Sequence, residues 1–259
     1  MQISGKTVVI TGGGRGIGRE LAKAFAAKGG RIAALDLNQA DLDETVAQCK
    51  ALGVEARGYV ANVTDEQAVI AAMDAIVADL GSVDVLINNA GIVKDSLLLK
   101  VKDGAITGKM TLEQWQAVIN INLTGVFLCG REAAERMVKQ GRGGVIINIS
   151  SQMGHVGSPN RTVYCMTKHA VEGLTKAMAV ELAPESIRVC SVAPTFVDTP
   201  LVRRIIDTPE KEQFVLSSIP AGRLATETDI AAAVLYLASP SAAMVTGTSL
   251  VVDGGWTAR

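Results

Sequence analysis

The sequence contains few aromatic residues and no excess of either charge. Phe, Trp and Tyr make up 3% of its 259 residues, and 25 Lys and Arg nearly balance 26 Asp and Glu, for a net charge of −1. Proteins that bind nucleic acid usually present a basic surface, often with aromatic side chains on which bases stack. The composition therefore argues against a nucleic-acid partner.

Histidine and cysteine are also scarce. The chain has two histidines and four cysteines, and the cysteines do not form a CxxC pair: Cys49, Cys129, Cys165 and Cys190. Metal sites and disulfide frameworks both need such residues in recognisable spacings. We expect neither, and we interpret the cysteines as unreactive thiols of a reducing compartment.

Long hydrophobic runs are missing. A membrane-spanning helix needs roughly 18 consecutive apolar residues, and the first residues, MQISGKTVVITGG, lack the basic and apolar segments of a signal peptide. These absences predict a soluble cytoplasmic protein without a membrane partner.

What the sequence does contain is an alternation of two patterns. Short, β-branched apolar stretches alternate with longer stretches of helical periodicity, and 26 glycines punctuate them. The expected strands lie at 7–11, 31–36, 55–62, 83–91, 143–151, 187–194 and 248–255, and the main expected helices at 18–30, 40–53, 65–81, 112–141, 163–184 and 227–239. This alternation predicts an α/β fold, in which one doubly wound parallel sheet of Rossmann type carries helices on both faces. We expect one dinucleotide-binding catalytic domain over residues 1–259.

Two segments interrupt the alternation. Residues 95–111, DSLLLKVKDGAITGKMT, are predicted to form an inserted loop or a small hairpin. Residues 195–223 are polar, contain prolines and follow a predicted strand. Ligands of open α/β sheets bind beyond the carboxyl ends of the strands, so the second segment is predicted to be a substrate lid.

A glycine cluster follows the first predicted strand. In TGGGRGIG, residues 11–18, Gly12, Gly16 and Gly18 fit a tight turn in which a pyrophosphate approaches the start of a helix. Asp36 ends the next predicted strand, where a carboxylate would bind the adenosine ribose and repel a 2′-phosphate, which favours NAD over NADP. Arg15 opposes this interpretation, because a guanidinium in the loop could pair with a phosphate.

Tyr164 and Lys168 are four residues apart in YCMTK. On a helix this spacing places both side chains on one face. A lysine charge near a phenol favours the phenolate, which would give a general acid/base working near neutral pH. Such pairs are also common on solvated helix faces, so the spacing alone does not decide the function.

The motifs taken together resemble those of the classical short-chain dehydrogenase/reductase family. They occur in the family's order from residue 5 to about residue 255, and are the segments TGGGRGIG, NNAG (88–91), NLTGVF (122–127), INISS (147–151), YCMTK, VAPTFVDTP (192–200) and TGTSLVVDGG (246–255). The resemblance implies a nicotinamide-dependent oxidoreductase that acts on CH–OH groups.

The resemblance assigns four catalytic residues. Tyr164 would exchange a proton with the substrate oxygen, and Lys168 would lower the tyrosine pKa and hold the nicotinamide ribose. Ser151 would hydrogen-bond the substrate oxygen, and Asn122 would hold a water molecule in the proton relay.

The resemblance also implies a set of cofactor-binding residues, with two departures from the family pattern. Asn62 stands where an aspartate usually contacts the adenine, and Thr195 replaces a glycine and is expected to narrow the nicotinamide end of the pocket. The complete set is Gly12, Arg15, Gly16, Ile17, Gly18, Asp36, Leu37, Asn62, Val63, Asn89, Ala90, Gly91, Tyr164, Lys168, Pro194, Val197 and Thr199.

The substrate pocket is expected to contain Ser151, Met153, His155, Arg161, Tyr164, Phe196 and Leu201. This mixture predicts a small, partly polar secondary alcohol or ketone such as a polyol, a sugar or a hydroxy acid, with NAD as cofactor. Two alternatives stay open: an NADPH-dependent 3-oxoacyl-thioester reductase and a non-catalytic dinucleotide sensor. The resemblance further implies a homotetramer assembled through helices near 112–139 and 163–183 and the C-terminal DGGWTAR.

Overall fold

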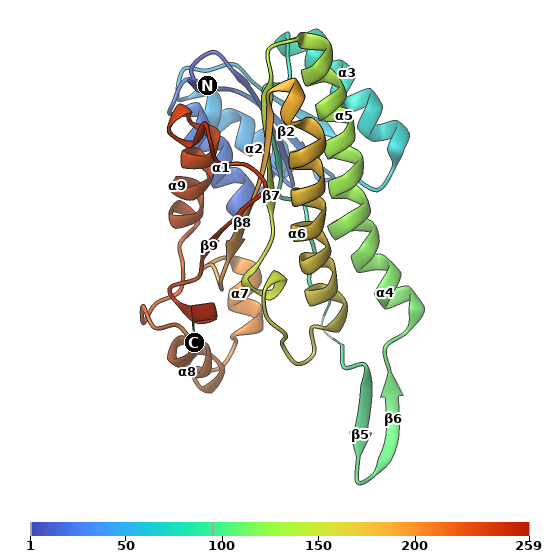
Figure 1. Ribbon diagram of the computed structural model, residues 1–259. Helices are drawn as coiled ribbons and strands as arrows, with labels where there is room; N and C mark the ends of the chain where they lie inside the picture. Colours follow the sequence, from blue (N-terminus) through green and yellow to red (C-terminus); the bar gives the residue numbers. More distant parts are fainter. Residues whose placement is uncertain (1, 95, 259) are drawn as a thin grey trace.

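The predicted sheet forms as expected. In a computed structural model that describes residues 2–94 and 96–258, apart from the side chain of Leu201, seven strands make one parallel sheet (Figure 1). Its order is β3-β2-β1-β4-β7-β8-β9. The strands are β1 (Thr7–Thr11), β2 (Arg31–Asp36), β3 (Ala56–Val60), β4 (Val85–Asn88), β7 (Gly144–Ile149), β8 (Ile187–Pro194) and β9 (Ser249–Val252).

Helices cover both faces of this sheet. Successive side chains of a strand point to opposite faces, so Val8 and Ile10 of β1 join one core cluster and Val9 joins the other. Apolar side chains of α1 (Gly16–Ala26), α2 (Gln39–Lys50) and α9 (Glu227–Ala238) complete the first cluster, and those of α3 (Glu66–Leu80), α5 (Gly125–Gln140) and α6 (Thr162–Leu182) complete the second. This arrangement confirms the doubly wound fold.

The long helical pattern at 112–141 contains an irregular turn. Helix α4 (Leu112–Ile119) continues through a π-helical segment, Asn120–Thr124, into α5. The α5 helix ends at Gly141, whose φ of 65° lies in the left-handed region that glycine adopts without strain. A π-helical turn often marks a functional position, and this one contains Asn122.

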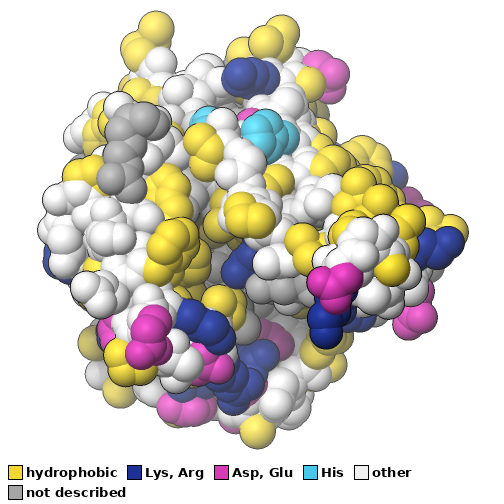
Figure 2. All heavy atoms as spheres, turned by 90° about the horizontal axis from the view of Figure 1, so that it is seen from below, with side chains coloured by type: hydrophobic (Ala, Val, Ile, Leu, Met, Phe, Trp, Pro, Cys, Tyr) yellow, Lys and Arg dark blue, Asp and Glu magenta, His cyan; other side chains and the backbone are white. Residues whose placement is uncertain are grey.

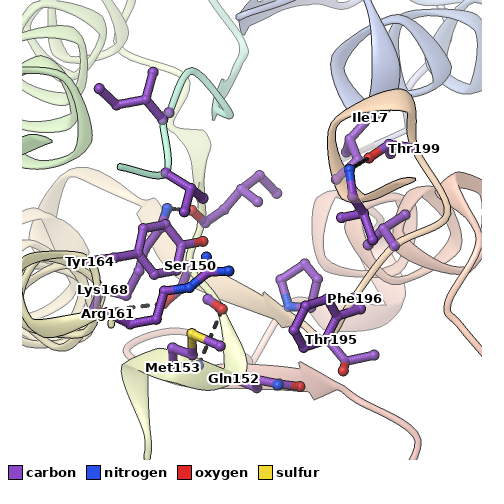
Figure 3. Close-up of a pocket in the computed structure, with 18 of the residues that line it drawn as sticks. Ile17, Ser150, Gln152, Met153, Arg161, Tyr164, Lys168, Thr195, Phe196 and Thr199 are labelled. Atoms are coloured by element: carbon purple, nitrogen blue, oxygen red, sulfur yellow. Dashed lines mark hydrogen bonds between the residues drawn. The ribbon is translucent and has the colours of Figure 1, made fainter. Parts of the chain in front are cut away.

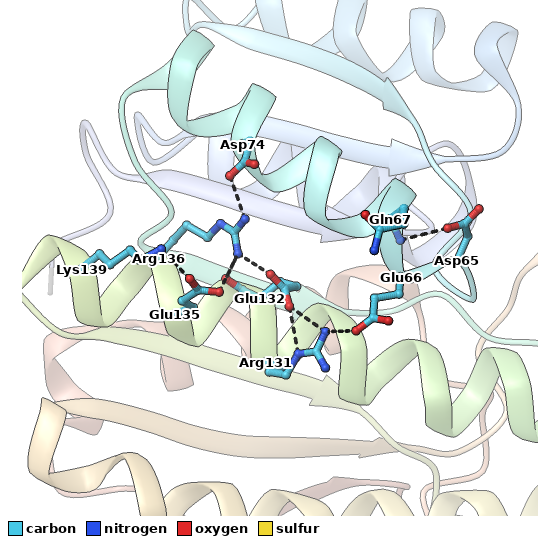
Figure 4. Close-up of polar contacts among 9 residues, drawn as sticks. All are labelled: Asp65, Glu66, Gln67, Asp74, Arg131, Glu132, Glu135, Arg136 and Lys139. Atoms are coloured by element: carbon cyan, nitrogen blue, oxygen red, sulfur yellow. Dashed lines mark hydrogen bonds and ion pairs between the residues drawn. The ribbon is translucent and has the colours of Figure 1, made fainter.

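An ion-pair network joins α3 to α5 (Figure 4). Arg136 on α5 donates to Asp74 of α3 at 2.7 Å and also contacts the buried Glu132, while Arg131 pairs with Glu66 at the start of α3. Burial acts to lower the pKa of Arg136, but the Asp74 and Glu132 carboxylates outweigh it and raise this pKa above its ordinary value. The guanidinium groups thus neutralise acidic side chains of both helices and fix α3 against α5.

The inserted segment is a hairpin. Strands β5 (Leu99–Lys102) and β6 (Ala105–Lys109) pair antiparallel around a turn in which Asp103 and Gly104 have positive φ, and the hairpin extends away from the body of the molecule (Figure 1). Asp95, the first residue of the predicted insertion, lies outside the described residues.

The predicted lid segment contains two short helices that the sequence analysis did not predict. Helices α7 (Pro200–Ile205) and α8 (Pro209–Ser218) both begin with a proline and have a threonine N-cap, Thr199 and Thr208. Proline is tolerated at the first helical position because its missing N–H would be unpaired there. The prolines therefore start helices in this segment.

No described helix is long and apolar enough to cross a lipid bilayer.

Candidate active site

The predicted site residues gather at the carboxyl edge of the sheet. The loops that follow β1, β4, β7 and β8 begin there with Gly12, Asn89, Ser150 and Thr195, and α6 passes beside them. Open α/β sheets bind ligands at this edge. The same topology therefore brings together groups that are up to about 180 residues apart in the chain.

The glycine loop is shaped for a close backbone approach. A Cβ atom on Gly18 would lie 2.0 Å from the Gly12 carbonyl oxygen, so only glycine fits at the start of α1. Gly12 has a φ of 63° and Gly16 a φ of 54°, and Asn89 Nδ2 holds the loop by donating to the Thr11 and Gly12 carbonyls at 3.0 and 3.1 Å. This loop could accommodate a pyrophosphate at the N-terminus of α1.

Asp36 is fixed beside this loop. Its Oδ2 accepts a hydrogen bond from the Gly14 N–H at 3.0 Å, and its Oδ1 accepts from the Leu37 N–H at 2.7 Å. In Asn62 the side-chain carbonyl accepts from the Thr64 N–H and hydroxyl, at 3.0 and 2.9 Å, so its amide nitrogen is the group that could face an adenine. Arg15 is exposed at the edge of the loop.

Tyr164 and Lys168 lie on the pocket side of α6. The Lys168 ammonium is 5.6 Å from the centroid of the tyrosine ring and donates to the Ile149 carbonyl oxygen at 2.8 Å. Lys168 is 6% exposed, and this burial lowers its pKa from 10.5 to about 8, although the Glu172 carboxylate acts in the opposite direction. The site therefore holds a desolvated cation next to a phenol.

Ser151 and Asn122 are held by local backbone contacts. Ser151 follows β7, caps the 3-10 helix Gln152–Gly154, and its Oγ accepts from the Met153 N–H at 3.2 Å. Asn122 is fully buried. Its Nδ2 donates to the Ile92 carbonyl oxygen at 2.9 Å, and its Oδ1 accepts from the Ile92 N–H at 2.8 Å. Both side chains are thus positioned before any ligand arrives, and their roles stay predictions.

A cavity of about 170 Å³ opens between these elements (Figure 3). Tyr164, Lys168 and Arg161 lie on one side of it, and Thr195 and Phe196 on the other. Seen from below the sheet, this end of the molecule carries hydrophobic side chains around a hollow (Figure 2). The lining includes many predicted residues: Ile17, Asn89, Gly91, Ser151, Met153, Arg161, Tyr164, Lys168, Pro194, Phe196, Val197 and Thr199.

His155 does not line this cavity, although we predicted it there. It is partly exposed, and its Nε2 lies 3.2 Å from Ser249 Oγ and 3.6 Å from the Glu172 carboxylate. The 3-10 helix after Ser151 turns the histidine toward β9, and its role in the substrate pocket stays a prediction. For Leu201, the other predicted residue missing from this lining, the side chain lies outside the described part of the structure.

Two buried polar residues line the cavity beyond those predicted to form it. Gln152 follows Ser151 and is 1% exposed, and Thr195 is 9% exposed. Thr195 was predicted only to narrow the pocket, and Gln152 was not singled out. The threonine in place of glycine at position 195 was the only sequence signal for a polar group in this part of the pocket. It could not show that Gln152 lines the same cavity.

Comparison with known proteins identifies the family. A family model described as enoyl-(acyl carrier protein) reductase matches residues 12–257. A crystal structure of a short-chain type dehydrogenase/reductase from Mycobacterium marinum is 37% identical, with a TM-score of 0.92 over 100% of this chain and 98% of that one. The chain belongs to the short-chain dehydrogenase/reductase family.

Similar members of this family carry different substrate names. A 3-oxoacyl-(acyl-carrier-protein) reductase from Thermotoga maritima is 40% identical over 98% of this chain and 99% of its own length. A D-threitol dehydrogenase from Mycolicibacterium smegmatis is 37% identical over 100% of this chain and 95% of its own. A 7α-hydroxysteroid dehydrogenase solved with NADH is 35% identical, with a TM-score of 0.91 over 98% of this chain and 95% of that one.

Membership in the short-chain dehydrogenase/reductase family shows an oxidoreductase that acts on CH–OH or keto groups with a nicotinamide dinucleotide. The residues present fit this cofactor. Gly18 admits no side chain against the Gly12 carbonyl, and Asp36 is held within hydrogen-bonding distance of the same loop. The family membership does not choose between NAD and NADP, or between the substrate classes that its members' names give.

Proposed function

We propose that this protein is an NAD-dependent dehydrogenase of small, polar secondary alcohols, or a reductase of the matching ketones. The observation that carries the cofactor choice is the Asp36 carboxylate, held by the Gly14 and Leu37 N–H groups. A carboxylate at this position can accept hydrogen bonds from both ribose hydroxyls and repels a 2′-phosphate. The cavity lining is mostly apolar but contains the buried polar side chains of Gln152 and Thr195, and these support the substrate class because such groups favour ligands that can hydrogen-bond to them.

The residues of the chain would divide the chemistry as follows. Bound nicotinamide would supply the hydride acceptor for alcohol oxidation. Tyr164 would take the hydroxyl proton of the substrate, because the Lys168 ammonium stabilises negative charge on the phenol oxygen. Ser151 would orient the substrate oxygen by donating to it, since its hydroxyl hydrogen is not used in accepting from Met153. The α7 segment would cover the cavity through Val202 and Ile205, which line it.

A substrate panel tests this function. We would measure initial rates of nicotinamide reduction with polyols, sugars, hydroxy acids, other secondary alcohols and 3-hydroxyacyl thioesters, using NAD and NADP in parallel. The expected result is NAD-dependent oxidation of small polar alcohols, which Tyr164→Phe reduces by about a hundredfold or more. Oxidation of large apolar alcohols alone, such as steroids, would contradict the substrate class.

A 3-oxoacyl-thioester reductase that uses NADPH is the second candidate. It is favoured by the names of several similar proteins and by the exposed Arg15, whose guanidinium could pair with a 2′-phosphate. Activity confined to NADPH and thioesters in the same panel would establish it instead. A non-catalytic sensor would need the glycine loop but not the four residues of the proton relay, and all four occur here.

A homotetramer built through α4, α5 and α6 is the assembly that we propose. Large apolar side chains are exposed on these helices: Leu112 is 77% exposed, Phe127 44% and Val180 77%. Apolar surface of this kind is costly in water and typical of contacts between subunits. Part of the C-terminal segment that we also expect at the interface, Arg259, lies outside the described residues.

The double substitution Phe127→Glu, Val180→Glu should therefore break the assembly into smaller species. Two new carboxylates in each buried contact would have to be desolvated without a partner. Light scattering coupled to size-exclusion chromatography gives the mass of each species. Leu52→Glu, at a residue that is 48% exposed just after α2, is the matched control and should leave the mass unchanged. A wild-type mass equal to one chain would refute the tetramer.

A further inference from the structure

Three buried polar atoms of the cavity have no hydrogen-bond partner. Five buried side-chain nitrogen and oxygen atoms in the described part of the chain lack a partner, and three of them are Nε2 and Oε1 of Gln152 and Oγ1 of Thr195. Both residues line the candidate active site. A buried polar atom without a partner destabilises the folded protein, because it has lost its hydrogen bonds to water. Their concentration at one site therefore points to a ligand that would satisfy them.

Both side chains stand on fixed backbone. The backbone carbonyl of Gln152 accepts from the N–H groups of His155 and Val156 at 2.9 and 3.2 Å, and these bonds hold the 3-10 turn after Ser151. The Thr195 N–H donates to the Val252 carbonyl of β9 at 3.1 Å. The two groups are thus preorganised by separate elements, since one follows β7 and the other follows β8.

The arrangement places the pair away from the proton-transfer residues. In Figure 3, Thr195 lies across the cavity from Tyr164, and the Gln152 carboxamide extends toward the Thr195 side. Tyr164 would hold the reacting oxygen at the other side. A ligand that reaches both sides must therefore carry a second polar group near the reacting carbon.

We propose that Gln152 and Thr195 form a subsite for a second hydroxyl group of the substrate, and that this subsite selects vicinal diols and polyols. The proposal rests on the function proposed above and specifies its substrate class. A carboxamide offers a donor and an acceptor, and a threonine hydroxyl can act as either. A substrate hydroxyl can donate to Gln152 Oε1 and accept from Nε2 or from Thr195, whereas an alkyl group would leave all three atoms unpaired.

The test compares 1,2-propanediol with 2-butanol, which differ only by a hydroxyl in place of a methyl group. The measured quantity is the ratio of kcat/KM for the diol to kcat/KM for the mono-alcohol, with NAD. We expect the wild type to prefer the diol by about a hundredfold, because a site built to hydrogen-bond a hydroxyl rejects an analogue that lacks it. Gln152→Leu and Thr195→Val should each lower this ratio by about tenfold, mainly through loss of activity with the diol.

Two further measurements separate this role from others. A purely structural role would lower the melting temperature of both variants, whereas removal of unpaired buried groups should leave it unchanged or raise it. Gln48→Leu on α2, whose amide donates to Glu44 at 3.0 Å, is the control and should keep the wild-type ratio. The dissociation constant for NAD should also stay the same in both cavity variants.

The outcomes are distinct. If the wild type oxidises both alcohols but the variants leave the ratio unchanged, the subsite is refuted and the proposed dehydrogenase function stands. Weaker NAD binding with an unchanged ratio would assign the pair to the cofactor, which also overturns the proposal. If only 3-hydroxyacyl thioesters react, or if no alcohol gives a rate sensitive to Tyr164→Phe, both the subsite and the proposed function fail.

Discussion

Replacing Lys168 with methionine is expected to abolish most of the activity while making the protein more stable. Turnover should fall by about a hundredfold to ten-thousandfold, which is the range for losing an acid/base group. The reason is that the ammonium, 5.6 Å from the Tyr164 ring centroid, is the cation placed to stabilise the phenolate. Methionine is a similarly unbranched side chain, one atom shorter, and it removes the ammonium together with its charge and its hydrogen bond to Ile149.

The gain in stability follows from the burial of the same charge. The fall of the Lys168 pKa from 10.5 to about 8 corresponds to about 3 kcal/mol against the charged form in the folded state. Methionine avoids this cost but leaves the Ile149 carbonyl without its donor, which costs about 1 kcal/mol. The free energy of unfolding at neutral pH should therefore rise by about 2 kcal/mol.

The pH dependence has a definite sign. Because the folded pKa lies below the unfolded one, the folded wild type binds fewer protons between about pH 8 and 10.5, and its stability rises across that interval. The advantage of Lys168→Met should therefore be largest below about pH 8 and shrink toward pH 10.5. Urea unfolding at about pH 7 and about pH 9.5 measures both values.

Lys176→Met is the matched control for this experiment. Lys176 is exposed on the same helix, two turns farther along, so its replacement should change stability by less than about 0.5 kcal/mol and leave activity intact. A Lys168→Met protein that is less stable than wild type at neutral pH would show that the ammonium is a structural group. Retained turnover would remove Lys168 from the chemistry.

Much of the fold was predictable because its signals are local. The apolar stretch at 7–11 is short, β-branched and followed by glycine, and Val8, Val9 and Ile10 are all fully buried in β1. Strands covered on both faces are continuous apolar runs in the sequence, so their alternation with helices implied the parallel sheet. The glycine loop was visible for the same reason, since residues close in sequence form it.

Side-chain direction inside the site was not predictable, because distant elements decide it. His155 follows a 3-10 helix and contacts Ser249, which is 94 residues later in the chain, at the start of β9. Gln152 and Thr195 face one cavity only because β7 and β8 are neighbours in the sheet. The π-helical turn around Asn122 could not be predicted either, because the helical periodicity of the sequence continues without a break from α4 into α5.

Asp36→Asn is expected to shift the cofactor preference from NAD toward NADP. The aspartate charge, near the position of a 2′-phosphate, opposes that group by about 3 kcal/mol if the separation is about 5 Å and the effective dielectric constant is about 20. Removing the charge should lower the ratio of kcat/KM with NAD to kcat/KM with NADP by about a hundredfold. Asparagine can still accept a hydrogen bond from the Gly14 N–H, so the loop should keep its shape.

Two further variants complete the cofactor experiment. Asp43→Asn removes the same charge from α2, where the carboxylate accepts from Gln39 at 2.7 Å, and should leave the cofactor ratio within about twofold of wild type. Arg15→Ala, made in the Asp36→Asn background, should selectively lower activity with NADP if the guanidinium pairs with the 2′-phosphate. A wild-type protein that already prefers NADP, with a ratio that Asp36→Asn does not change, would show that Arg15 rather than Asp36 determines the cofactor and would favour the thioester reductase.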